Sequence, residues 1–320
     1  MAILCAAVFR LCTMDLGYYL FRIRDSQLIN YLLTYLETGQ DVRFSPSSKV
    51  FSPDFVETPH PVLPEKQEPP LPFFSGTDLV QVQYFRSVSA DLEALITQPL
   101  QWNLYSQEPS VLIVHTHATE SYAKNSKPYQ ESAAYRTLDE EYNMLCIGAL
   151  VAEYLNNNGI STLQDRTLHD YPSYNGSYSN ARKSIEAYLE QYPSIRLVLD
   201  LHRDASESSG KQLRTLAQVD GGHSAQLMVV IGANHKDYTE NVSLGLKLHA
   251  QLESQAPGIT RPMQLRAQRF NQDLLPGMLL IEVGAAGNTH EEARQAAHQL
   301  ALAVTALARG TRSPEKTDKP

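Results

Sequence analysis

Three short apolar runs, each containing or followed by His or acidic residues, do most to limit what this chain can fold into. They span residues 111–114, 195–201 and 278–283, and helical patterns separate them along the chain. Continuous runs of Val, Ile and Leu are typical of strands that are buried on both faces of a sheet. Alternation of such strands with helices predicts an α/β fold with a central sheet and flanking helices.

The helical segments are recognised by apolar residues spaced three or four apart and by end signals. We expect helices over residues 139–157, 177–191 and 242–253, and a last one after Thr289, which forms a T-x-x-E capping box with Glu292. A further strand is expected over residues 160–164, and a hairpin connection at residues 220–222.

Composition along the chain divides it into four parts. Residues 41–74 contain eight prolines, which cannot donate to a strand ladder or continue a long helix, so they form a stiff linker. The expected parts are an N-terminal helix or truncated membrane anchor at 1–40, this linker, a catalytic domain at 75–309 and a disordered tail at 310–320.

The N-terminal segment admits two interpretations. MAILCAAVF is apolar, but Arg10 and Asp15 interrupt the run, whereas a membrane-spanning helix needs about 20 largely apolar residues. The segment also lacks the basic start and cleavage site of a secretory signal. A soluble helix and an anchor that lacks its upstream residues both remain open.

Net charge and cysteine content exclude several functions. The formal net charge is −8, whereas nucleic-acid binders usually present a basic face, so nucleic acid is not expected as a partner. Cys5, Cys12 and Cys146 are an odd set, with the first two close together near the start. They support neither a disulfide framework nor a cysteine-based zinc ribbon.

Candidate site residues lie at or near the ends of the predicted strands. His115, His117 and Glu120 follow the first strand, His202 ends the second and Glu282 lies near the end of the third. Open α/β sheets bind ligands at the carboxyl ends of their strands. Because alternate residues of a strand share a face, we expect His115 beside His117, and Asp200 beside His202.

These residue types favour a metal-dependent hydrolase. Two imidazoles and a carboxylate hold catalytic zinc while leaving a position open for water or a substrate carbonyl. Glu282 is then available as general base, and Asp200 as the acceptor that holds His202 in its ligating tautomer. Taken alone, Glu282 could instead be a partner for Arg203 or for a backbone amide.

Several long motifs add a family resemblance over about residues 75 to 309. HTHATESY, TLHDYPSYNGSYSNARKSIEAYL, PSIRLVLDLHRDA, FNQDL and LLIEVGAAGNT occur in this order, and the chain resembles the catalytic region of stage II sporulation protein P. The resemblance implies a zinc-dependent N-acetylmuramoyl-L-alanine amidase fold and activity on peptidoglycan, with endopeptidase activity on cross-linked stem peptides. It also implies a role in engulfment on the extracytoplasmic face of the mother-cell membrane, membrane anchoring, and stage II sporulation proteins D and M as partners.

Transferred to this chain, the resemblance implies one histidine of the HTH motif, Glu120 and His202 as metal ligands and Glu282 as the catalytic carboxylate. His117 is favoured over His115, because His117 lies three residues before Glu120 at the strand exit. The other histidine, together with Asp200 and Arg203, would support the ligands from behind. An alternative third ligand is Glu140 or Glu141, at the start of the predicted helix.

Substrate contacts are expected from two polar loops. Tyr171, Tyr174 and Tyr178 offer flat amphipathic surfaces, Arg182 a fork for a stem-peptide carboxylate, and Asn271 a group on a loop that closes over the site. Two rival functions are considered. One is a noncatalytic peptidoglycan-binding scaffold, and the other is an amidohydrolase of small N-acyl substrates, which the tether-like linker disfavours.

Overall fold

A computed structural model describes residues 79–84, 90–100, 102–123, 135–205, 207–208, 211–219 and 222–310. The predicted N-terminal helix or anchor, the whole proline-rich linker at 41–74 and the tail after residue 310 lie outside these residues. Within the described part of the chain, no helix has both the length and the apolar character needed to cross a membrane.

A seven-stranded mixed sheet forms the centre of the described domain, in the order β1-β10-β9-β11-β4-β2-β3. Strands β3, β2, β4 and β11 are parallel, whereas β9 is antiparallel to β11 and carries β10 and β1 parallel to itself. The bounds are β1 Val82–Tyr84, β2 Val111–Val114, β3 Thr162–Gln164, β4 Leu197–Asp204, β9 Leu227–Gly232, β10 Met263–Arg266 and β11 Met278–Ala285. The predicted α/β class with a central sheet is confirmed.

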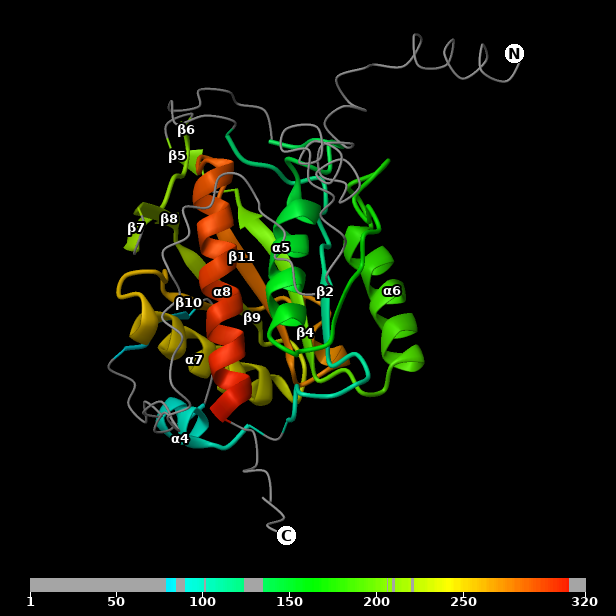
Figure 1. Cartoon of the computed structure of the whole chain (residues 1–320), viewed down its shortest axis with the longest axis vertical. Helices are drawn as coiled ribbons and strands as arrows, with labels where there is room; N and C mark the ends of the chain where they lie inside the picture. Colours follow the sequence, from blue (N-terminus) through cyan, green and yellow to red (C-terminus); the bar gives the residue numbers. More distant parts are fainter. Residues whose placement is uncertain are drawn as a thin grey trace, which may run out of the picture. The chain divides into compact units, whose positions relative to one another are not determined.

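Helices cover the sheet on both faces (Figure 1). They are α4 Leu92–Thr97, α5 Met144–Asn157, α6 Ser177–Gln191, α7 Tyr238–Gln255 and α8 His290–Gly310, with a short 3-10 turn η1 at Gln272–Leu274. The larger core joins α5, α7 and α8 to one face through residues such as Ile113, Leu199 and Ile281. On the other face, Ile185 of α6 packs with Val198 and Met278.

Most elements expected from the sequence are present, and the differences have local causes. Helix α6 has the expected bounds, whereas α5 begins at Met144 and not at residue 139. Asn143 caps α5, since its side chain accepts a hydrogen bond from the Leu145 amide at 2.9 Å. The capping box of α8 is confirmed by the reciprocal bonds of Thr289 and Glu292, at 3.0 and 3.2 Å.

The expected hairpin at residues 220–222 joins β7 (Leu216–Val219) and β8 (Gly222–Ala225), which pair antiparallel. Its second arm ends at Ala225, and the following β9 enters the main sheet between β10 and β11. A second small pair, β5 (Glu207–Ser208) and β6 (Lys211–Gln212), lies between β4 and this hairpin in the chain. All four short strands are outside the main sheet.

Candidate active site

Parallel strands β2, β4 and β11 end at one edge of the sheet, where the polar residues of the expected site collect. Glu282 of β11 is the register partner of His202 in β4, and Asp200 lies two residues before His202. Register partners on neighbouring strands point to the same face, as do alternate residues of one strand. Asp200, His202 and Glu282 therefore project from the face that α6 covers.

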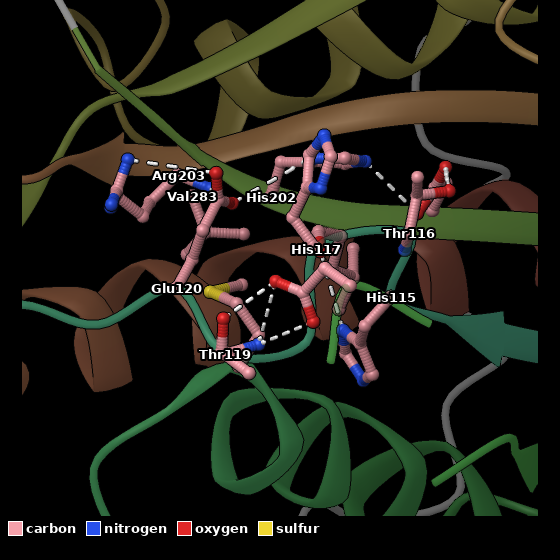
Figure 2. Close-up of polar contacts among 12 residues, drawn as sticks. His115, Thr116, His117, Thr119, Glu120, His202, Arg203 and Val283 are labelled. Carbon is pink, nitrogen blue, oxygen red and sulfur yellow. Dashed lines mark hydrogen bonds and ion pairs between the residues drawn. The ribbon is translucent and has the colours of Figure 1, made fainter. Parts of the chain in front are cut away.

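The two histidines of the HTH motif do not share a site. β2 ends at Val114, and the chain then turns, with the Glu120 amide donating to the His117 carbonyl at 3.1 Å. The expectation that His115 lies beside His117 is therefore wrong, because strand alternation stops before His117 is reached. In Figure 2 the His115 and His117 rings point to opposite sides of this segment.

His115 is a fully bonded core residue on the α5 side. Its Nδ1 lies 3.3 Å from the Leu201 carbonyl, and its Nε2 lies 3.0 Å from the Gln164 amide nitrogen. Burial lowers the pKa of His115 to about 4, so the ring is neutral at pH 7. A Cβ on Gly148 of α5 would stand 2.3 Å from His115 Nε2, so this close approach requires glycine. As placed, both ring nitrogens of His115 are occupied within the fold.

His117 faces the site instead. Its ring stacks on Tyr174 at a centroid distance of 4.5 Å and meets His202 edge-on at 5.2 Å. The Nε2 atom lies 3.2 Å from the Tyr174 hydroxyl, while the buried Nδ1 has no hydrogen-bond partner among the described residues. Burial, with the neighbouring His202 and Arg136, lowers the pKa of His117 to about 3. His117 is thus a neutral ring with one nitrogen available to a ligand.

His202 lies between two carboxylates. Its Nε2 is 3.0 Å from Asp200 Oδ1, and its Nδ1 is 3.7 Å from Glu120 Oε2. Burial alone would lower the pKa of His202, but the negative charges of Asp200, Glu120 and Glu282 raise it to about 9. Asp200 forms an ion pair with Nε2, although this contact lacks the geometry of a hydrogen bond, and Nδ1 is directed toward Glu120.

Buried Arg203 holds Glu120 in place from behind. The Arg203 amide donates to Glu120 Oε2 at 3.2 Å, and its guanidinium lies 3.6 Å from Oε1. The same side chain donates to the carbonyls of Ser121 and Tyr135, at 3.1 and 2.7 Å. The Arg203 side chain therefore connects Glu120 to the backbone at Ser121 and at Tyr135.

The alternative third ligands lie elsewhere. Glu140 forms an ion pair with Arg166, and both side chains are about half exposed. Glu141 is exposed, and its amide donates to Asp139 at 3.1 Å. Of the three candidate glutamates, Glu120 is the one in contact with His202.

Glu282 completes this edge of the sheet. Its Oε2 atom is buried, and no described residue forms a hydrogen bond with that atom. Burial raises the pKa of Glu282 to about 8; the Glu120 charge adds to this rise, whereas His202 opposes it. A carboxyl that changes protonation near neutral pH suits a general acid and base.

Two buried aspartates fix the turn that carries His117 and Glu120. Asp200 accepts hydrogen bonds from both the amide and the hydroxyl of Thr116, at 2.8 and 2.7 Å. Asp170 does the same for Thr119, at 3.3 and 2.6 Å (Figure 2). We call these two contacts the aspartate–threonine clamps. They hold the turn at both ends.

Sequence reasoning did not identify Asp170 or Arg136 as part of the site. Arg136 donates to Asp170 at 2.6 Å and to Thr119 at 3.1 Å, and it lies 4.6 Å from the Tyr174 ring centroid. Its side chain is 27% exposed, so it is accessible at the rim. The polar His169-Asp170 pair within a predicted loop was the available signal for Asp170.

The expected substrate residues differ in their surroundings. Tyr174 is 54% exposed and covers His117. Asn271 donates to the Tyr178 carbonyl at 2.9 Å. Arg182 is shared between Asp273 at 3.0 Å and Glu186 at 2.9 Å, so a stem-peptide carboxylate would compete with these partners.

The residue types at this site are ones that bind zinc, although their side chains are not close enough together to enclose an ion. Among the described residues, no three His, Cys, Asp or Glu side chains stand close enough to enclose a metal ion. Yet the buried Nδ1 of His117 and Oε2 of Glu282 lack partners. Buried polar atoms are rarely left unpaired, and a cation beside them would remove this cost. The chemistry of the site therefore fits a metal that gathers His117, His202 and Glu120.

Comparison with known proteins gives one family. Residues 64–305 match the profile of "Stage II sporulation protein P (SpoIIP)". Stage II sporulation protein P of Bacillus subtilis (strain 168) is 28% identical over 202 residues, which cover 60% of this chain and 49% of that protein. The match thus spans about half the length of this relative.

Two solved structures are also similar. The N-acetylmuramoyl-L-alanine amidase AmiC2 of Nostoc punctiforme is 16% identical with a TM-score of 0.38, covering 64% of this chain and 96% of the amidase. The CwlD amidase from Clostridioides difficile, solved in complex with the GerS lipoprotein, is 14% identical with a TM-score of 0.40, covering 62% and 96%. The family assignment rests on the sequence profile.

Proposed function

Since the chain belongs to the stage II sporulation protein P family, we propose that it is a zinc-dependent hydrolase of peptidoglycan. In this proposal the enzyme cleaves the amide bond between N-acetylmuramic acid and L-alanine. Its second activity is cleavage of cross-linked stem peptides. One observation carries the proposal: His117, His202, Glu120 and Glu282 meet at the sheet edge, with buried donor atoms that lack partners.

The zinc ligands in this proposal are His117, His202 and Glu120. When bound there, zinc would lower the pKa of a water molecule and polarise the substrate carbonyl. Asp200 keeps His202 oriented from its other nitrogen, and Arg203 keeps the Glu120 carboxylate beside it. The residues around these two ligands therefore fix the direction of both side chains.

Glu282 is the proposed general base. Its partly buried carboxyl, on the strand next to His202, takes a proton from the attacking water and passes it to the leaving amide nitrogen. The raised pKa of about 8 keeps the proton available for this second transfer. Water oxygen then becomes part of the muramyl carboxylate, and the stem peptide leaves with a free amino terminus.

Family membership also supports a proposed cellular setting. We place the protein at the extracytoplasmic face of the mother-cell membrane during engulfment, anchored through its N-terminal region. Stage II sporulation proteins D and M are its proposed partners. The support is the profile match over residues 64–305.

Digestion of purified sacculi by the full chain tests the activity. Release of intact stem peptides, detected by mass spectrometry, should stop with a chelator and return with zinc. Glu282→Gln should bind sacculi without releasing stems. Wild-type binding with no release under any zinc condition would instead support a noncatalytic peptidoglycan scaffold.

A further inference from the structure

Tyr178 lies beside the two proposed histidine ligands. It stands in the first turn of α6, and its ring meets His117 edge-on at 5.5 Å. It is nearly parallel to His202 at 6.3 Å, and Phe270 packs against it at 5.8 Å. The aromatic ring therefore forms a wall of the site.

The loop after β10 fixes the backbone of Tyr178. Asn271 donates from its side chain to the Tyr178 carbonyl at 2.9 Å, and Gln272 bonds to the backbone of β9 at both ends of its amide. Phe270 and Asn271 have φ values of 52° and 58°. This conformation is costly for a bulky residue such as Phe, and packing must maintain it. The fold therefore holds the tyrosine in a set position.

The hydroxyl of Tyr178 differs from that of Tyr174 in its hydrogen bonding. None of the described residues forms a hydrogen bond with the Tyr178 hydroxyl, although the ring is largely buried and Asp200, Glu120 and Glu282 act on it electrostatically. In contrast, the Tyr174 hydroxyl is 3.2 Å from His117 Nε2. An ordinary phenol is protonated at neutral pH and can donate one hydrogen bond. Tyr178 thus presents an uncommitted donor beside the proposed ligands.

Resting on the proposed hydrolase function, we propose that the Tyr178 hydroxyl donates a hydrogen bond to the carbonyl oxygen of the scissile amide. As the water oxygen bonds to the carbonyl carbon, negative charge grows on the carbonyl oxygen. The C–N bond then breaks, with Glu282 supplying the proton to nitrogen, and Tyr178 keeps its own proton throughout. A fixed donor aimed at a developing oxyanion is typically worth about 10²–10³ in kcat.

The test compares Tyr178→Phe with Tyr188→Phe. Phenylalanine keeps the ring and removes only the hydroxyl, while Tyr188 lies on the same helix among apolar residues of the α6 face. We expect Tyr178→Phe to lower kcat for stem release from sacculi about 100-fold. KM, zinc content and thermal unfolding should match the wild type, and Tyr188→Phe should match in every measurement.

A second readout is independent of turnover. A phosphinate analogue of the muramyl–alanine bond carries a tetrahedral oxyanion, so Tyr178→Phe should weaken its binding about 100-fold. Unchanged kcat and unchanged analogue binding would refute the role of Tyr178 alone. Loss of zinc or a change in KM only would also refute it, since Tyr178 would then support the ligands or bind substrate uniformly. A wild type that releases no stems would refute the hydrolase function and this role together.

Discussion

Buried polar residues on the two faces of the sheet differ in how their side chains are hydrogen-bonded, as His115 and His117 illustrate. On the α5 side, both nitrogens of His115 have partners, and Arg203 bonds to the carbonyls of Ser121 and Tyr135. On the α6 side, His117 Nδ1 and Glu282 Oε2 are buried with no partner among the described residues. Two histidines that are two positions apart in the sequence thus have opposite surroundings.

We interpret this difference as one between residues that maintain the fold and residues that serve the proposed chemistry. An unpaired buried polar group costs about 1–3 kcal/mol, and a fold rarely retains several such groups together without a use for them. On the α5 face, the side chains of His115 and Arg203 are bonded to other residues of the fold. On the α6 face, His117 and Glu282 each keep one buried atom without a partner among the described residues, which supports the proposed binding of zinc and substrate on this face.

The largest effect should come from Glu282→Gln. The amide has the same shape but cannot accept and return a proton, so we expect kcat for stem release to fall about 10³-fold. Zinc content, measured by mass spectrometry of the metal, should stay at the wild-type level. Activity near that of the wild type would remove Glu282 from the chemistry.

The next effect comes from exchanging the two histidines for alanine, one at a time. His117→Ala should lose zinc and turnover while its thermal unfolding stays close to that of the metal-free wild type. His115→Ala should keep zinc but lose about 2 kcal/mol in the free energy of unfolding, because Leu201 and Gln164 lose their partner. Zinc titration and denaturant unfolding measure these effects. Loss of zinc in His115→Ala, with zinc retained in His117→Ala, would show that His115 and not His117 is the ligand.

A smaller effect is expected from the aspartate–threonine clamps. Thr119→Val keeps the shape but removes the hydroxyl that donates to Asp170 at 2.6 Å. Zinc affinity should fall about 10-fold, since groups that orient metal ligands usually contribute at this level. Thr97→Val is the control, because Thr97 is an exposed helix residue that bonds only to its own helix. Equal zinc affinity in both variants would show that the turn needs no clamp.

The smallest expected effect is the change with pH in the thermal stability of the zinc-free chain. The pKa of His202 is raised from 6.5 to about 9, so its stabilising contribution is complete below pH 6.5 and is lost as the pH rises through 9. Glu282 has its pKa raised from 4.5 to about 8, so stability also falls as the pH rises from 4.5 to about 8, because the folded state keeps a proton that the unfolded state has lost. Calorimetry of the zinc-free chain should show Tm falling by roughly 5 °C between pH 6.5 and 9. Glu282→Gln should have a shallower fall, and a Tm that rises over this interval would contradict both shifts.

Sequence alone predicted the elements whose patterns are long and local. Helix α6 and the capping box of α8 are examples, because their signals lie within one segment. Strands β1 and β10 were not predicted, since Val82–Tyr84 and Met263–Arg266 are short and become strands through pairing with each other and with β9. Pairing across distant segments leaves little trace in a single sequence.

The same limit applied to the candidate site. Strand-end position was enough to bring His202, Glu282 and the HTH segment to one edge. Strand alternation did not predict that His115 and His117 lie on different sides of the segment. Their placement depends on where β2 ends, and it ends at Val114, before either histidine. The contacts of Asp170 with Thr119 and Arg136 join segments 51 and 34 residues apart, so they depend on how the loops fold back.

The aspartate–threonine clamps also bear on how such a protein would acquire its metal. Ordering a loop costs conformational entropy, and here the turn between Asp200 and Asp170 is ordered when the chain folds. Metal capture then needs little further ordering of the backbone. Under the proposed function, activity would then follow the supply of zinc reversibly and would return without new protein synthesis.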